Sequence, residues 1–477
     1  MPSAAISLPA LPPPSWLKAF RDLDHSYAFQ RQRVEGQLPL ELQGTLVRVG
    51  PVSFGVGGQR YGHWFDGDGG VLGVRLEKGE AYAAARAVET PSIQAEREAG
   101  KVLYSNYGTP APSLWRRLFG GVKNAANTSA LAWNGRLFAL VEAAQPTELS
   151  LHDLRTIGET DLGGVLGPSF SAHPHAVGAR RALYNFGVRY GAVTWLDLYE
   201  LQEGGRVRQL GGLPLPGPVL VHDFIATERH LVFFLSPVRM RLMRMLLGRG
   251  SLSDNFEWRP ELGTEVLVVP IDAPGRARRF QVEPFHSWHF ANAFEQQGRI
   301  VVDYVRYPDF GSNQWLAEQL KGWASTETDG RLHRATLDVR AGTLHSEAVS
   351  DRRCEFPLVS PHHAGGRHRY VYTAGHRGRS TWRGPQDSVV KVDMDTGEEK
   401  VATFEFEHYP SEPIFVPHPN GKREDDGWLL TQTYDAPNDR TYVAVLDART
   451  PEAGPVARVW LEHFFPFTFH GTWVPAR

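Results

Sequence analysis

Short apolar runs separated by turn residues follow one another along most of the chain. Some alternate apolar and polar positions, and others are apolar over about four to eight residues between Gly, Asp, Asn or Pro, as in all-β domains. Strands are therefore predicted at 70–77, 134–142, 181–190, 192–201, 230–237, 264–272, 299–307, 333–340, 368–375, 388–395, 428–435, 441–448 and 456–465.

The number and even spacing of these strands favour one closed all-β architecture. A chain of 477 residues exceeds the usual size of a two-layer core. Because the amino-acid composition does not change along the chain in a way that marks a second domain, a β-propeller fits better than two sandwiches. We predict a single β-propeller domain over residues 1–477, with 1–38 as an N-terminal extension. No blade motif repeats, so periodicity does not give the number of blades.

Three short segments interrupt the β pattern and are predicted to be helical: 113–123, 236–250 and 313–323. The second has apolar Leu242, Met243, Leu246 and Leu247 beside basic Arg241 and Arg244. A core helix is the alternative, but four arginines in eleven residues are unusual for one. We therefore predict peripheral membrane contact through Pro237–Leu247, with Leu114–Val122 as the next candidate.

Composition excludes several other classes of protein. The formal net charge is −2 with 22% charged residues and no block of like charge, which argues against a nucleic-acid partner. The one cysteine, Cys354, excludes an intramolecular disulfide and favours a reducing compartment. The N-terminal stretch has no signal-peptide pattern, and no run of 18 apolar residues occurs. We predict a cytoplasmic, peripherally membrane-associated protein.

A histidine with small or polar neighbours, leading into a β-rich aromatic segment, recurs four times, at 171–177, 221–228, 288–295 and 465–473. A single histidine is more often hydrogen-bonded near a core than bound to a metal, so the recurrence carries the argument. Spacing between His173, His222, His289 and His470 allows each to lie on the innermost strand of a different blade. The third segment follows closely on a further histidine, His286.

Three carboxylates, Glu142, Glu355 and Glu412, lie beside apolar runs. Burying a lone carboxylate costs several kcal/mol, so each needs a cationic or N–H partner. The second nitrogen of a metal-bound imidazole would supply one. Four neutral imidazoles leave the +2 charge of a metal uncompensated and up to two positions open, which suits dioxygen and an electron-rich substrate. Imidazole binds iron, zinc and copper, so ligand type alone does not choose the metal.

Ten ordered motifs resemble those of the carotenoid cleavage oxygenases over roughly residues 39–474. The likeness is closest to the bacterial apocarotenoid oxygenases. The motifs are ELQGTLVRVGP, HWFDGDGG, KNAANTSALAWNGRLFALVE, AHPH, VHDFIATE, HFANAFE, EFP, SVVKVDMDTG, SEPIFVPHP with EDDGW, and FHGTW.

This resemblance implies a seven-bladed propeller whose short helices and loops form a cap over the metal centre. It also implies one non-haem Fe(II) per chain on the axis, with four histidine ligands and no carboxylate ligand. Matched motif by motif, the ligands are His173, His222, His289 and His470. The family's ligand lies three residues before an asparagine in the third motif, which selects His289 over His286.

The resemblance also assigns residues behind the ligands, pairing Glu142 with His222, Glu355 with His289 and Glu412 with His470. Thr128 matches a threonine that lies near the iron in relatives and restricts its open coordination.

Three positions depart from the family pattern: Val49, Gly70 and Val141 stand where Asn, Met and Trp are usual. None removes a ligand. Val141 is expected to line the substrate cavity, which leaves the exact substrate and the cleavage position open.

The implied activity is Fe(II)-dependent addition of O₂ across one C=C bond of an apocarotenoid, an apolar polyene. Two carbonyl products would result, with retinal-type aldehydes among them. One alternative is a dioxygenase that cleaves stilbene-type phenylpropanoids. Others are a metal-bearing propeller that binds or isomerises a retinoid without O₂, and a scaffold without chemistry. Oligomeric state is not specified by these patterns.

Overall fold

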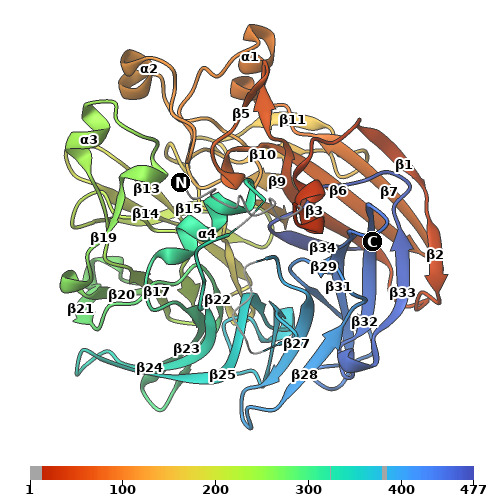
Figure 1. The fold of residues 1–477 in the computed structure, drawn as a ribbon. Coiled ribbons are helices and arrows are strands. Elements are labelled where there is room, and N and C mark those ends of the chain that lie inside the picture. The colour runs from red at the N-terminus through yellow and green to blue at the C-terminus, as the bar shows by residue number, and fades with distance from the viewer. Residues whose placement is uncertain (1–12, 323, 379–383, 477) are drawn as a thin grey trace, which may run out of the picture.

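The chain folds into sheets that radiate from a common axis (Figure 1), in a computed structural model that describes residues 13–322, 324–378 and 384–476. We number the blades from the sheet that holds the chain's first strand. Blade 1 has the order β1 (Tyr27–Arg31), β7 (Glu80–Ala87), β6 (Asp68–Glu77), β3 (Gly44–Ser53) and β34 (Gly471–Pro475). Blade 2 has β11 (Thr156–Glu159), β10 (Thr147–Leu149), β9 (Arg136–Leu140) and β8 (Ser129–Trp133). Blade 3 has β12 (His175–Val177), β13 (Ala182–Arg189), β14 (Trp195–Gln202) and β15 (Val207–Pro214).

The next sheets continue around the ring. Blade 4 has β16 (Ile225–Ala226), β17 (His230–Leu235), β20 (Thr264–Pro270) and β21 (Arg278–Val282). A longer sheet follows, with β22 (Phe290–Gln296), β23 (Arg299–Arg306), β24 (Arg331–Asp338), β25 (Thr343–Leu358), β26 (Tyr370–Gly375), β27 (Ser388–Asp393) and β28 (Glu399–Thr403). The last has β2 (Arg33–Gly36), β33 (Pro455–Trp460), β32 (Arg440–Asp447), β31 (Gly427–Asp435) and β29 (His408–Pro410), and β30 (Ile414–Pro417) also pairs with β31.

The long sheet consists of two blades that share one strand. β25 pairs with β24 up to Arg353 and with β26 from Cys354 onward. Counted in this way, the described residues form seven blades, of which β22–β24 with the first part of β25 make blade 5. The rest of β25 with β26–β28 makes blade 6, and the last sheet is blade 7. The predicted all-β propeller is confirmed.

Both ends of the chain close the ring. The C-terminal β34 pairs with β3 of blade 1, and the N-terminal β2 pairs with β33 of blade 7. A short 3₁₀-helix (Ser15–Phe20) buries Trp16, Ala19 and Phe20. The described residues of the predicted extension 1–38 are thus part of the propeller, because β1 pairs with β7 of blade 1 and β2 pairs with β33 of blade 7.

Tight turns explain why many neighbouring strands form hairpins. Lys78-Gly79, Asn134-Gly135 and Gln297-Gly298 each have two successive residues with positive φ between paired strands. That is the type I′ geometry, whose twist matches that of the strands it joins. Apolar faces of neighbouring blades then pack together; Val47 and Val71 of blade 1, for example, share a cluster with Leu137 of blade 2.

Four α-helices lie outside the described sheets: α1 (Pro91–Ala99), α2 (Leu114–Phe119), α3 (Leu242–Leu246) and α4 (Gly311–Gln319). α4 lies over the centre of the ring, while α2 and α3 are neighbours at its margin (Figure 1). None of the helices in the described ranges is both long and apolar enough to cross a membrane. We did not predict α1, although Thr90 caps it, Pro91 begins it and the left-handed Gly100 ends it.

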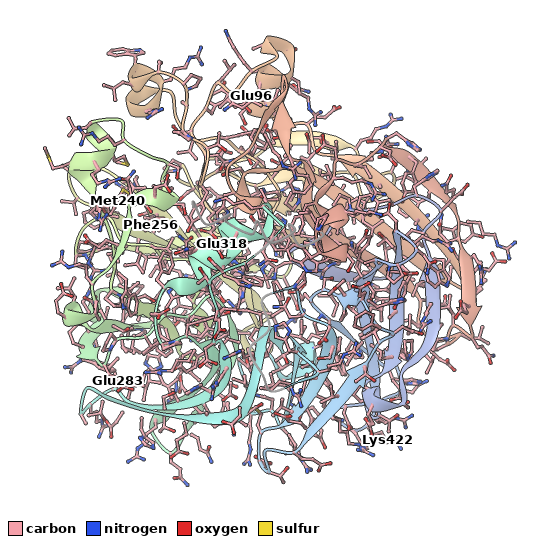
Figure 2. The ribbon with its side chains drawn as sticks, viewed as in Figure 1. Glu96, Met240, Phe256, Glu283, Glu318 and Lys422 are labelled. Carbon is pink, nitrogen blue, oxygen red and sulfur yellow. The ribbon has the colours of Figure 1, made fainter. Side chains whose placement is uncertain are left out.

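The predicted helix over 236–250 is wrong in its first part. Val238–Met240 forms strand β18, paired with β19 (Phe256–Trp258), and only one helical turn follows as α3. The extended pairing buries Val238 in an apolar cluster with Trp288, which outweighs the helical spacing of the leucines. Met240 and Phe256, partners across this pair, both line the central cavity (Figure 2).

Candidate metal centre

Each blade contributes one predicted site residue to the axis. The four histidines lie one to three residues before the innermost strand of a blade: His173 before β12, His222 before β16, His289 before β22 and His470 before β34. The carboxylates come from the three remaining blades, with Glu142 after β9, Glu355 in β25 and Glu412 between β29 and β30. Convergence of the blades therefore brings together residues that are far apart in the sequence.

The four imidazoles form one cluster. Ring centroids of His173 lie 4.4 Å from His222, 5.1 Å from His289 and 4.8 Å from His470. Nε2 of His222 and Nε2 of His289 are 3.3 Å apart. Two nitrogens about 2.1 Å from one ion and at right angles are about 3.0 Å apart, so this separation suits a shared metal.

The carboxylates lie against the outer nitrogens of three rings, in the predicted pairs. His289 Nδ1 is 2.5 Å from Glu355 Oε2, and His470 Nδ1 is 2.8 Å from Glu412 Oε1. Nδ1 of His222 contacts Glu142. Where Nδ1–H of His289 and of His470 donates to its carboxylate, Nε2 keeps its lone pair, which is the tautomer that a metal ligand needs.

Two of the carboxylates are held by further donors that sequence reasoning missed. Arg48, fully buried in β3, donates from Nη1 to Glu412 Oε2 at 2.6 Å, and Gly471 N–H donates to the same oxygen at 2.9 Å. The Tyr307 hydroxyl donates to Glu355 Oε1 at 2.7 Å. A charged residue inside the apolar run LVRVGP was the available signal for Arg48, since a buried arginine needs an anionic partner.

Electrostatics keep these groups in the states that metal binding requires. Burial would raise the pKa of Glu355 and Glu412, but the facing imidazoles His289 and His470 and the hydrogen-bond donors lower it below the usual value. Burial and the neighbouring rings hold the pKa of His173 well below its usual value. We infer ionised carboxylates and a neutral His173 at neutral pH.

His286 lies apart from this cluster. Its Nδ1 is 3.0 Å from the Ser236 hydroxyl, and its ring packs edge-on against Trp288. Among the described residues, His173, His289 and His470 offer nitrogens within 4.8 Å of one another, and His286 belongs to no such group. Ligation by His289 rather than His286 is therefore the arrangement that the geometry favours.

Val141 lines the cavity, as expected, and Thr128 lines it too. The Thr128 hydroxyl donates to Asn127 Oδ1 at 3.0 Å, and its carbonyl accepts from the backbone N–H of the ligand His470 at 3.1 Å. Phe356, which has a positive φ of 55°, stacks on His289 with ring centroids 5.4 Å apart. An aromatic wall thus stands beside the ligands.

A cavity of about 950 Å³ extends from the centre to the helices of the cap. At the centre it is lined by His222, His289 and His470. Met245, in α3, and Val122, which follows α2, line it toward the margin of the ring. This volume is at the upper end of the usual range for small-molecule sites, so a long apolar molecule is a suitable occupant.

The donor set fits a metal ion. Nε2 of His173 is buried and has no hydrogen-bond partner among the described residues, which is costly unless a ligand supplies one. Four converging imidazoles, three backed by carboxylates, meet the requirement for fixed tautomers and charge balance. Fold and site together define a β-propeller with a cluster of histidines on its axis that fits a metal ion.

Comparisons with known proteins agree with this class. The model of the retinal pigment epithelial membrane protein family matches residues 20–475, and the chain belongs to that family. It is 33% identical to the apocarotenoid-15,15'-oxygenase of a Synechocystis strain, over 99% of this chain and 98% of that one. A carotenoid 9,10(9',10')-cleavage dioxygenase of Phaseolus vulgaris is 27% identical, over 92% of this chain and 86% of that protein.

Solved structures show the same likeness. Cobalt-substituted Synechocystis ACO superimposes with a TM-score of 0.88 at 32% identity, covering 97% of this chain and 98% of that chain.

Proposed function

We propose that the protein is an Fe(II)-dependent dioxygenase that cleaves one C=C bond of an apocarotenoid with O₂. The two products would carry carbonyl groups, with retinal-type aldehydes among them. The support is the four-histidine cluster at the inner end of a large cavity, together with relatives that are named as apocarotenoid and carotenoid cleavage enzymes.

The reaction balances without any other reactant. R–CH=CH–R' and O₂ give R–CHO and R'–CHO, so the C=C bond and the O–O bond break while two C=O bonds form. Both oxygen atoms enter the products, and no proton or external electron is needed. Bound Fe(II) would supply the open coordination positions and the redox chemistry that dioxygen addition requires.

The chain's own residues position and protect the reactants. His173, His222, His289 and His470 would hold the metal, and the carboxylates fix the orientation of three of these rings. Phe356, Trp288 and Phe469 line the cavity close to the cluster and exclude water from the polyene. Alignment of one double bond in a confined site is worth several orders of magnitude in rate.

Membrane contact is part of this proposal, because an apolar polyene resides in lipid. Leu114, Trp115 and Val122 are exposed in or just after α2, and Met243 and Leu247 are exposed in or just after α3. Arg117 Nη1 donates to the Gly248 carbonyl and links the two helices. Because Val122 and Met245 also line the cavity, this exposed apolar surface is continuous with its wall.

A product assay tests the activity. Protein loaded anaerobically with Fe(II) is given apocarotenals of several lengths and, separately, stilbenes; O₂ uptake and product masses are recorded. We expect one O₂ consumed per polyene cleaved and two carbonyl products. Cleavage of stilbenes but not of apocarotenals would show that the substrates are stilbenes rather than apocarotenoids. Turnover without O₂ uptake would contradict the dioxygenase proposal.

The matched control for that assay is the His470→Ala protein treated in the same way. Loss of cleavage in this variant ties the activity to the cluster rather than to free iron.

A further inference from the structure

Three polar side chains lie where blades 5 and 6 adjoin, in a cavity that is otherwise largely apolar. Arg353 lies in β25, His376 directly follows β26, and Thr328 precedes β24; all three line the cavity. Each carries a buried atom without a hydrogen-bond partner among the described residues: Arg353 Nη1, His376 Nδ1 and Thr328 Oγ1. We call this group the polar recess.

Unpartnered buried polar atoms are costly, because each has lost its hydrogen bonds to water without gaining a partner. Native proteins contain few of them, so three that border one part of a cavity indicate a ligand that supplies the missing partners. His376 is 4% exposed, so its ring is not solvated from outside. Thr328 also lies close to the Tyr307 hydroxyl, and the argument therefore rests chiefly on Arg353 and His376.

The recess lies beside the metal centre. Arg353 is two residues before Glu355 on β25, so their side chains share a face and their Cα atoms are about 6–7 Å apart. The backbone N–H of His376 donates to the Arg353 carbonyl at 3.2 Å, which places the two side chains on adjoining strands. Blade 6 lies across the ring from α2 and α3 (Figure 1). A polyene that enters at those helices would reach the recess with its leading end.

The chemistry of the recess favours an oxygen that accepts hydrogen bonds. Arg353 Nε donates to Asp329 Oδ1 at 3.0 Å, and Arg331 Nε donates to the same oxygen at 2.8 Å, so Nη1 of Arg353 remains available. Burial lowers the pKa of His376 to about 4, so its ring is neutral at neutral pH and can donate from Nδ1. Thr328 can also donate. The nearest carboxylate that lines the cavity is Glu355, whose two oxygens are already engaged by His289 Nδ1 and the Tyr307 hydroxyl.

We propose that Arg353 and His376, assisted by Thr328, bind the oxygen of a terminal carbonyl or carboxylate group on the polyene. This contact selects oxygenated substrates over hydrocarbons and fixes which double bond lies at the metal centre. The identity of the substrate as a polyene rests on the proposed function. The end-group preference, in contrast, is a binding property that needs neither metal nor turnover.

The test uses metal-free protein and three polyenes of equal length that end in a methyl group, an aldehyde or a carboxylic acid. Dissociation constants are measured from the absorption change of the polyene. We expect wild-type protein to bind at least one oxygenated polyene about 10–100-fold more tightly than the hydrocarbon, the range for a hydrogen bond to a charged group. A stronger preference for the acid identifies a carboxylate, and equal preference identifies a carbonyl oxygen.

Arg353→Leu should remove the preference and leave hydrocarbon binding unchanged. Asp329 keeps its bond to Arg331 in this variant, so no buried carboxylate loses its only partner. Arg331→Leu is the matched control. This substitution removes the other guanidinium that binds Asp329, and Arg331 does not line the cavity. His376→Phe provides a second variant if Arg353→Leu does not fold.

Equal binding of all three polyenes by wild-type protein, or a preference that persists in both recess variants, would overturn the proposal. Cleavage assays on the same polyenes separate this from the proposed function. Equal cleavage of all three polyenes would support the dioxygenase activity and contradict the role of the polar recess. A binding preference without any cleavage would support the role of the recess and contradict the dioxygenase activity.

Discussion

The metal centre has a closed side and an open side. On the closed side, Glu355 and Glu412 have side chains that are each 11% exposed and accept hydrogen bonds from Tyr307 and Arg48. On the open side, the Glu142 side chain is 30% exposed and lines the cavity. Among the described residues, His222 is the one ion-pair partner of the Glu142 carboxylate.

The order of the blades explains this difference. Glu355 and Glu412 reach histidines on adjacent blades, His289 on blade 5 and His470 on blade 1. Glu142 on blade 2 instead reaches His222 on blade 4, past the intervening ligand His173. One side of the ring is therefore fixed by packed, charged networks, while the other faces the cavity. This arrangement combines a rigid ligand set with access for reactants.

The largest effect is expected from the ligands, on both sides alike. Replacing His173 or His470 by Ala should remove bound metal and abolish turnover, because each removal leaves three imidazoles and a distorted shell. Metal content by atomic spectroscopy and product formation are the measurements. His286→Ala is the control and should keep both. If His286→Ala loses its metal while His289→Ala retains it, the ligand assignment is wrong.

Arg48→Met should have the next largest effect, confined to the closed side. It leaves Glu412 ionised, buried and without its cation, and breaking such a pair costs about 3–5 kcal/mol. Urea unfolding of the metal-free protein measures this loss. Adding Glu412→Gln should restore part of the stability, since it removes the unpaired charge. A loss below about 1 kcal/mol would show that the closed network does not stabilise the fold.

Neutral replacements of the carboxylates compare the two sides directly. Glu355→Gln should weaken metal binding about 100-fold, because it removes a charge that orients His289 from a buried, hydrogen-bonded position. Glu142→Gln should weaken it about 10-fold, since the partial solvent exposure of this side chain reduces its influence. Competition with a chelator gives both affinities. Equal losses would remove the distinction between the sides.

The smallest effect on the centre is expected from the distant exposed surface. Changing Trp115, Met243 and Leu247 together to Ser should reduce binding to vesicles about 10–100-fold, since each apolar side chain contributes up to about 1.5–3 kcal/mol when buried. Metal content and turnover of detergent-solubilised substrate should remain unchanged. Ile157→Ser, at another exposed apolar position, is the control. Parallel loss in both turnover assays would assign these residues to folding rather than to lipid contact.

Local patterns in the sequence were sufficient for the main strands and for the histidines and glutamates that converge on the axis. Each predicted strand is present because period-2 patterning, β-branched residues and turn dipeptides act over a few neighbours. The histidines and glutamates could likewise be found from motif and spacing, and the structure brings all seven together. The types of these side chains and their spacing are given by the sequence itself, so they can be identified before the fold is known.

Contacts between distant segments were decided only by the tertiary structure. Arg48 and Glu412 are 364 positions apart, and no local pattern pairs them. Strand β18 replaces a predicted helix because its partner β19 lies nearly twenty residues further on, and the N-terminal strands join blades formed by the far end of the chain. Arg353, His376 and Thr328 share a recess for the same reason. Closure of the ring determines which side chains meet at the axis, and it depends on the packing of all blades at once.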